Sequence, residues 1–262
     1  MPGVFTVRTF IALLALCVSL LGDVDAGIAA YSKGDYASAL KEFLLLAKEG
    51  NRDAARNLGV MYERGQGVSQ DYYQAAEWFR IAAKQGDAGA QFDLALMNDE
   101  GRGIPQDYEE AVKWYRLAAD QDQADAQYNL GLKYYFGKGV TQDLHEAAKW
   151  IRMAAEHGDA QAQNNLGVLY DQGQGIAQSS AEAVKWYRSA AEQGFAGAQF
   201  NLAARYLMGQ GIPQPWTDSN SRRRPSRRRL SRQYPASSRR RSLPVGTTPG
   251  LFPESCRRFL RL

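Results

Sequence analysis

The chain has 262 residues, of which 45% are hydrophobic and 11% aromatic, enough for one large domain or an array of small repeated units. Its formal charge of +4 conceals an asymmetry, because residues 215–262 carry 13 Arg, no Lys and two acidic residues, a net charge of +11. The remainder has 19 basic and 26 acidic residues, a net charge of −7, so the basic balance of the whole chain gives no reason to class its folded part as a nucleic-acid-binding protein.

The first 26 residues have the order of a secretory signal peptide. A positive charge at Arg8 precedes an apolar run over 10–21, and Val24-Asp25-Ala26 supplies small residues for cleavage. The apolar run is shorter than the roughly 20 residues that a membrane-spanning helix needs. We expect cleavage after residue 26 and a mature chain without a membrane span, exported to the periplasm or secreted; an uncleaved N-terminal anchor is the alternative. Cleavage would leave Cys256 as the one cysteine, so stability must come from packing.

Four kinds of residue recur with a period of 36 residues along the chain. They are Trp78, Trp114, Trp150 and Trp186; Leu58, Leu94, Leu130, Leu166 and Leu202; alanine pairs that begin at Ala82, Ala118, Ala154 and Ala190; and Gly-x-Gly motifs that begin at Gly65, Gly101, Gly137, Gly173 and Gly209. Because unrelated residue types share one period, we predict a repeat array.

Each repeat is predicted to form two helices, as its second copy illustrates. Helix A is expected over 88–100 and ends at Gly101 and Gly103, since glycine adopts left-handed backbone angles without steric cost. Helix B starts after Asp107, whose carboxylate caps the first turn, and Trp114 fills the gap between neighbouring units. No unit can bury its apolar face alone, so we predict an all-α, right-handed α/α superhelix, a solenoid of helix-turn-helix repeats.

The same register extends weakly towards the N-terminus. Residues 27–50 keep several columns, but Glu42 replaces the tryptophan and a full helix A has no room after the signal peptide. We therefore predict a repeat domain over 27–214, with an N-terminal cap at 27–50 and repeats from about residue 51. The second repeat deviates most from the others, with Asn98 in a tyrosine column and Asp122 in a glycine column.

The repeated residues resemble the Sel-one-like repeat (SLR) family, relatives of the tetratricopeptide repeat, over about 27–214. The family pattern Ala-x-Ala-Gln-x-x-Leu-Gly-x-x-Tyr is seen in residues 160–170, followed by Gly173-x-Gly175, Trp186-Tyr187 and Ala190-Ala191. The resemblance implies an adaptor or scaffold, commonly in exported bacterial proteins and in eukaryotic membrane-protein quality control. Some cysteine-rich secreted relatives bind or hydrolyse β-lactams, but their cysteine pair in each repeat is absent here, so that activity is not carried over.

Little in the sequence suggests catalysis. The Gly-x-Gly loops lack the further residues of a phosphate-binding loop. His145 and His157 are expected at opposite ends of one helix, about 18 Å apart at 1.5 Å per residue, too far apart to share a metal ion. Two histidines and a tail cysteine offer no nucleophilic set. We expect no enzymatic activity, no cofactor and no metal site, with β-lactam binding or hydrolysis as the alternative function.

The candidate binding residues lie at helix A positions outside the repeat pattern, which face the concave groove in related helical repeats. Equivalent positions of successive repeats form columns. One column has Arg56 in the first repeat and aromatic or amide side chains in the later repeats, and a second column contains Tyr135. Exposed aromatic residues suit peptide capture because a few large side chains dominate the binding free energy. We predict that an unidentified protein or peptide binds through Arg56, Phe92, Tyr128, Tyr135, Asn164 and Phe200. The alternative is that these side chains fill the contacts between adjacent A helices.

The tail over 215–262 breaks the register, because Pro215 replaces the capping aspartate and Arg222 stands where the next tryptophan belongs. One interpretation is a disordered polybasic arm for nucleic acid, acidic lipid or cell-wall polyanions, the one route by which we expect nucleic acid to bind. The other is a translational frameshift, since arginine without lysine beside many Ser and Pro resembles GC-rich sequence read out of frame. Either interpretation predicts no packed structure after residue 214.

Overall fold

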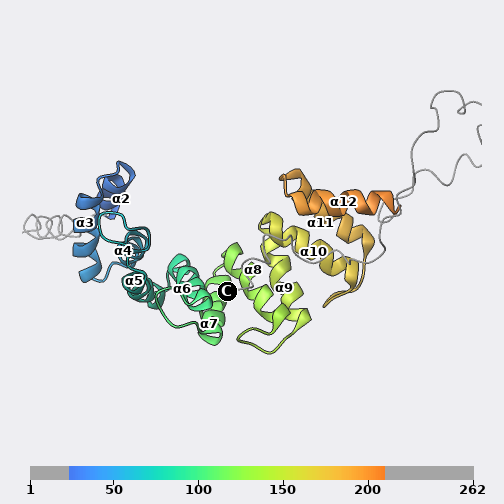
Figure 1. Ribbon diagram of the computed structural model, residues 1–262, viewed down its shortest axis with the longest axis horizontal. Coiled ribbons are helices and arrows are strands. Elements are labelled where there is room, and N and C mark those ends of the chain that lie inside the picture. Colours follow the sequence, from blue (N-terminus) through green and yellow to red (C-terminus); the bar gives the residue numbers. More distant parts are fainter. Residues whose placement is uncertain (1–23, 210–262) are drawn as a thin grey trace, which may run out of the picture. The chain divides into compact units, whose positions relative to one another are not determined.

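The structure, a computed structural model, describes residues 24–209. In this range the chain forms eleven α-helices and no strand (Figure 1). In chain order they are α2 (Val24–Ser32), α3 (Tyr36–Lys48), α4 (Arg52–Arg64), α5 (Tyr72–Lys84), α6 (Ala88–Glu100), α7 (Tyr108–Ala119), α8 (Ala124–Phe136), α9 (Leu144–Glu156), α10 (Ala160–Gln172), α11 (Ser180–Glu192) and α12 (Ala196–Leu207). The predicted signal peptide, except for its last three residues, and the arginine-rich tail lie outside the described residues.

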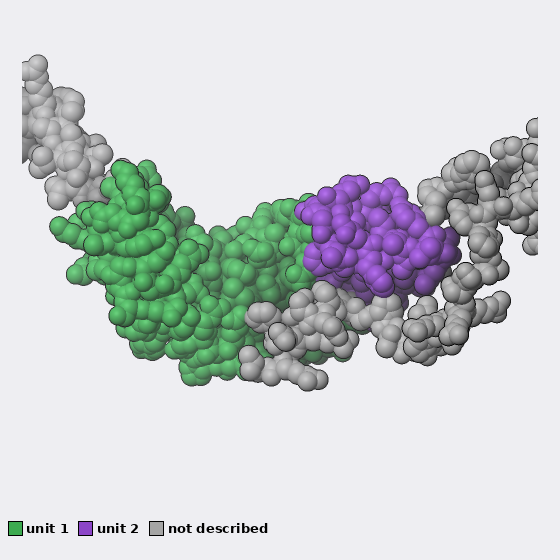
Figure 2. All heavy atoms as spheres, turned by 45° about the horizontal axis from the view of Figure 1, so that its top comes forward, with its two compact units in different colours: residues 1–162 green, residues 163–262 purple. Residues whose placement is uncertain are grey.

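Helices pack mainly on their neighbours in the chain. The A helices α4, α6 and α8 each pack on the B helix of the same repeat, and α5 and α7 pack in turn on the A helix of the next repeat. The chain divides into two compact units, residues 1–162 and 163–262 (Figure 2), with α11 packed on α12 in the second. This nearest-neighbour packing confirms the prediction of an all-α solenoid. Its right-handedness stays a prediction.

The loop between helix A and helix B is fixed at several points. Gly101 ends α6 in the left-handed conformation with φ of 69°, and Asp107 accepts the amide hydrogen of Glu110 at 3.0 Å at the start of α7. Between them, the Gln106 side chain donates to the Asp99 carbonyl at 2.7 Å, and the same bond recurs from Gln70, Gln142 and Gln178. The predicted caps are confirmed, whereas this glutamine bond was not foreseen.

The second glycine of the Gly-x-Gly motifs in the second and third repeats has a role that the sequence analysis missed. Gly103 has a positive φ of 74°, and a Cβ there would lie 2.4 Å from the carbonyl carbon of Tyr72, the first residue of the preceding helix B. A Cβ at Gly139 would lie 2.1 Å from the carbonyl oxygen of Tyr108 in the same way. These two glycines therefore let their loops touch the backbone of the preceding repeat.

The core is centred on the residue after each tryptophan. Phe79, Tyr115, Ile151 and Tyr187 are almost completely buried, whereas Trp78, Trp114 and Trp186 are only partly buried. In the tryptophan column Trp150 is buried, whereas Trp114 is only partly buried but packs against two neighbouring clusters of buried residues, as its predicted gap-filling role requires. Glycines of helix A leave room for the buried rings, because a Cβ at Gly59 would lie 2.6 Å from the Phe79 ring, and Gly167 has the same relation to Tyr187.

The N-terminal cap is a helix pair with a shorter loop. Gly27 in α2 is buried, and a Cβ there would lie 2.5 Å from the Phe43 ring of α3, as at Gly59 and Phe79 in the first repeat. The α2–α3 connection has three residues, four fewer than the α4–α5 connection. Because α2 begins at Val24, the predicted cleavage site lies inside it, and a chain cleaved there would keep residues 27–32 of this helix.

Among the non-glycine residues that the structure describes, Asp122 alone has a positive φ, 62°. It stands at the turn from helix B to the next helix A, where the other repeats have Gly86, Gly158 and Gly194 with φ of 87°, 96° and 86°. Its side chain is exposed and 3.9 Å from His157, an exposed pair that contributes little stability. The left-handed backbone angles of Asp122 therefore destabilise the second repeat, whereas the glycines at the equivalent turns adopt such angles without this steric cost.

The buried column predicts how two adjacent truncations differ. Tyr115→Ala should lower the free energy of unfolding by about 3–5 kcal/mol, because it empties a fully buried site. Trp114→Ala should cost at least about 1 kcal/mol less, since part of that ring is in solvent. Chemical denaturation of both variants measures the difference. An equal or larger loss for Trp114→Ala would contradict the assignment of the core.

The left-handed turn predicts a stabilising substitution. Asp122→Gly should raise the free energy of unfolding by about 0.5–1 kcal/mol, because glycine removes the steric cost at this φ while loosening the unfolded chain only slightly. Gly86→Asp is the matched control and should lose a similar amount at the equivalent turn. Destabilisation by Asp122→Gly in a thermal or chemical melt would show that the aspartate side chain contributes more than its backbone costs.

Candidate functional site

The predicted binding residues differ in exposure. Phe200 in α12 is 66% exposed, Arg56 in α4 is exposed, and Phe92 and Tyr135, in α6 and α8, are half-buried. Tyr128 and Asn164, in α8 and α10, are only 8% and 3% exposed. The expectation that these last two side chains are accessible is therefore wrong. Each of them hydrogen-bonds to a neighbouring A helix.

The buried members of this column connect successive A helices. Gln161 donates to the Tyr128 hydroxyl oxygen at 2.8 Å, and Asn201 donates to the Asn164 carbonyl oxygen at 3.0 Å. Both partners lie in the following helix A, 33 and 37 residues further along the chain. The alternative interpretation, contacts between adjacent A helices, thus describes these two residues.

Arg56 reaches the next repeat but stays partly in solvent. Its Nε lies 3.5 Å from Asp87 and 3.7 Å from Asp93, and its guanidinium group covers Gly89, where a Cβ would lie only 2.5 Å from it. Burial raises the pKa of Asp93 to about 6, and the Arg56 charge opposes this shift. The Phe92 ring, next to Asp93 in α6, is tilted against Tyr115 at a centroid distance of 6.0 Å. Unit 1 therefore places an arginine, a carboxylate and an aromatic ring on adjoining A helices.

The second column is mostly occupied by bonds that hold repeats together. In unit 2, Asp171 accepts a hydrogen bond from the Tyr187 hydroxyl at 2.7 Å and pairs with Arg205 Nε at 3.0 Å. In unit 1, Asp99 pairs with Lys133 and lies 3.5 Å from the Tyr115 hydroxyl.

These two clusters of aspartate, tyrosine and cation are buried and compensate one another's charge. Burial raises the pKa of Asp171, while Tyr187 and Arg205 oppose that rise. Burial also lowers the pKa of Lys133, and Asp99 opposes that shift. In each cluster, the carboxylate accepts a hydrogen bond from a tyrosine and pairs with a cation of the next helix A, so the cluster links successive A helices.

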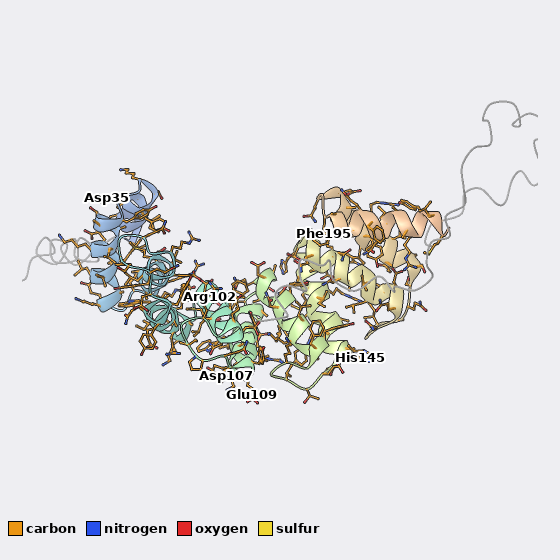
Figure 3. All side chains as sticks on the ribbon, in the orientation of Figure 1. Asp35, Arg102, Asp107, Glu109, His145 and Phe195 are labelled. Carbon is orange, nitrogen blue, oxygen red and sulfur yellow. The ribbon has the colours of Figure 1, made fainter. Side chains whose placement is uncertain are left out.

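Sequence reasoning missed these clusters, although a signal for them exists. In the second and fourth repeats, an aspartate is followed 16 residues later by tyrosine and 34 residues later by a cation. The first repeat has Glu63, Phe79 and Met97 at those positions, and the third has Tyr135, Ile151 and Leu169. Glu63 instead pairs at 2.7 Å with Arg102, in the loop after α6 (Figure 3). In the second and fourth repeats, the side chains of these three columns contact one another.

His145 lies at the N-terminal end of α9 (Figure 3) and His157 caps its C-terminal end, so the predicted separation of the two histidines is confirmed. Among residues 24–209, no three side chains of His, Cys, Asp or Glu come together as a metal ion would require. In that same range, each helix is too short or too polar to traverse a lipid bilayer.

The comparisons with known proteins match this repeat architecture. The family model of the Sel1 repeat matches residues 52–87, 88–123, 124–159, 160–195 and 196–219. The chain is similar to the crystal structure of a Sel1 repeat protein from Oxalobacter formigenes, with 38% identity and a TM-score of 0.70 over 73% of this chain and 79% of that one. A comparison with curated proteins gave no match.

A second solved structure is c5321, a protective antigen present in uropathogenic Escherichia coli strains that displays an SLR fold. It has 37% identity and a TM-score of 0.71, and the match covers 75% of this chain and 44% of the other, so this chain spans less than half of that protein. The family model covers more than half of the chain, and its five matches follow the 36-residue repeat of the structure. The chain therefore belongs to the Sel1 repeat family.

Proposed function

We propose that the chain is an exported scaffold that binds a protein or peptide through the accessible side of its A helices in unit 1. Sel1 repeat proteins generally mediate protein–protein interaction, and their fold is typically a non-enzymatic scaffold. The observation that carries the proposal is the accessible set on α4 and α6, where Arg56 and Phe92 lie beside Asp93. Arginine and aromatic residues are the side chains that most often dominate protein interfaces.

The charge of this region suggests the chemistry of the partner. The described residues carry a net charge of −7. Burial raises the pKa of Asp93 to about 6, and the nearby Arg56 charge offsets this shift only in part. A basic group beside an apolar side chain would pair with Asp93 and cover the Phe92 ring at once. We therefore expect a partner segment that contains lysine or arginine next to a large apolar residue.

The proposal predicts a separation of binding from stability. Phe92→Ala combined with Asp93→Asn should weaken capture of the partner at least tenfold and move the melting temperature only slightly, because both side chains are only partly buried. Affinity capture from the native periplasm, with mass spectrometry of the retained proteins, identifies the partner, and titration of that partner measures the loss.

Tyr128→Phe is the matched control. It removes a buried hydroxyl that hydrogen-bonds to Gln161, so it should lower stability while leaving capture unchanged. If the Phe92 and Asp93 variant lowers the melting temperature as much as Tyr115→Ala does and still captures the partner, these side chains serve repeat stacking and the binding surface lies elsewhere.

Export predicts a shorter mature chain. When the full gene is expressed in a Gram-negative host, the periplasmic fraction should contain a protein whose intact mass lacks residues 1–26. Ala26→Arg should block processing, because the cleavage site needs a small residue, and the precursor should accumulate. Recovery of an unprocessed, freely dissolved wild-type chain from the cytoplasm would contradict the proposal of export.

A further inference from the structure

The helix α12 exposes apolar side chains at positions that the other A helices cover. Leu58, Leu94 and Leu130 are fully buried, whereas Leu202 at the same position of α12 is partly exposed. Leu207 is 89% exposed. Of the exposed large hydrophobic side chains in the part of the chain that the structure describes, four belong to α12 or its cap: Phe200, Tyr206, Leu207 and Met208. They form the one place in that part where such residues gather on a single helix.

Elsewhere in the described residues, some side chains at the positions of Phe200 and Leu207 reach the next A helix. Arg56, in the column of Phe200, reaches Asp93 of the next A helix, and Asp99, in the column of Leu207, pairs with Lys133. The terminal repeats of solenoids ordinarily have a polar outer face. An apolar outer face at α12 therefore points to burial against a further helix.

The apolar stripe of α12 is complementary to itself. Phe200, Ala203 and Leu207 are spaced by three and four residues, so they lie along one side of the helix, and Ala203 between them is exposed. In an antiparallel pair that crosses between residues 203 and 204, Phe200 of one copy faces Leu207 of the other, and the alanines let the helix axes approach. A twofold-symmetric interface requires a patch of this kind, which packs against the same patch of a second copy.

Charge does not oppose this arrangement at the stripe. Arg205 is the single charged residue of α12, and it is paired with Asp171 inside unit 2. The continuation of the chain is a poor alternative cover, since Arg222 stands where a helix B would have its tryptophan.

We propose that two copies of the chain associate through an antiparallel, twofold-symmetric pairing of their α12 helices. A pair of 12-residue helices covers less area than the roughly 800 Å² per partner of a standard interface, so the dimer is weak, with a dissociation constant on the order of 10 μM. This interface does not depend on the proposed partner-binding residues Arg56 and Phe92, which lie in unit 1.

Sedimentation equilibrium of the full chain, at concentrations from about 1 to 300 μM, tests the proposal. A reductant is present throughout, so that Cys256 cannot join copies covalently. The wild type should shift from monomer to dimer across this range, and Phe200→Lys or Leu207→Glu should each weaken the dimer at least tenfold. The matched control is Tyr73→Glu, which places a charge at a 57% exposed ring of α5 and should leave association unchanged.

Mixing the two variants distinguishes the antiparallel pair from other arrangements. When Phe200→Lys and Leu207→Glu chains are combined, the new lysine of one copy faces the new glutamate of the other, while the unchanged Leu207 and Phe200 meet at the second contact. The mixture should therefore form heterodimers that neither variant forms alone. A wild type that stays monomeric at 300 μM, or a mixture that stays monomeric, overturns the proposal. A monomeric wild type whose melting temperature falls on Phe200→Lys would show instead that the chain's own continuation covers α12.

Discussion

In most repeats, the residue that follows the tryptophan of helix B packs directly on a glycine of helix A. Phe79 on Gly59, Ile151 on Gly131 and Tyr187 on Gly167 show the same close approach, and Phe43 on Gly27 repeats it in the N-terminal cap. The absence of a side chain at these glycines brings the two helix axes together, so the alanines around them become fully buried. The contacts between repeats depend on this arrangement, because a helix pair that splayed apart could not present its two faces to its neighbours.

The sequence predicts the fold well because it shows two periodicities, the 36-residue spacing of the repeats and the helical spacing of apolar residues within each repeat. The 36-residue spacing marks where each helix starts and stops, and aspartate caps and glycine ends fix the bounds, as α6 over 88–100 illustrates. The period does not say which of two neighbouring large side chains points inward. Trp78 and Phe79 lie about 100° apart around the helix, and Gly59, in a different column, leaves room for the Phe79 ring.

The candidate site was harder to predict for a related reason. We interpreted variation in residue type within a column as a sign of partner binding, but much of that variation comes from pairing between repeats. Asp99 pairs with Lys133, and Asp171 pairs with Arg205 at the equivalent positions, so the residue types in these two columns are linked. A column that varies together with another column indicates an internal contact. Arg56 and Phe92 remain candidates because they keep solvent exposure, and α12 stands out because its Phe200 and Leu207 side chains are exposed.

A double-mutant cycle at Gly59 and Phe79 tests the central packing interaction most directly. Gly59→Leu places a side chain where the Phe79 ring lies and should cost about 2 kcal/mol or more in the wild type, and Phe79→Ala should cost about 3–5 kcal/mol by itself. If the ring and the glycine are in contact as described, the leucine fills the space left by the ring, and the double variant is more stable than the sum of the two losses predicts by at least about 1 kcal/mol. Additive losses within about 0.3 kcal/mol would contradict the account, because they would mean that the two positions do not share one packing site.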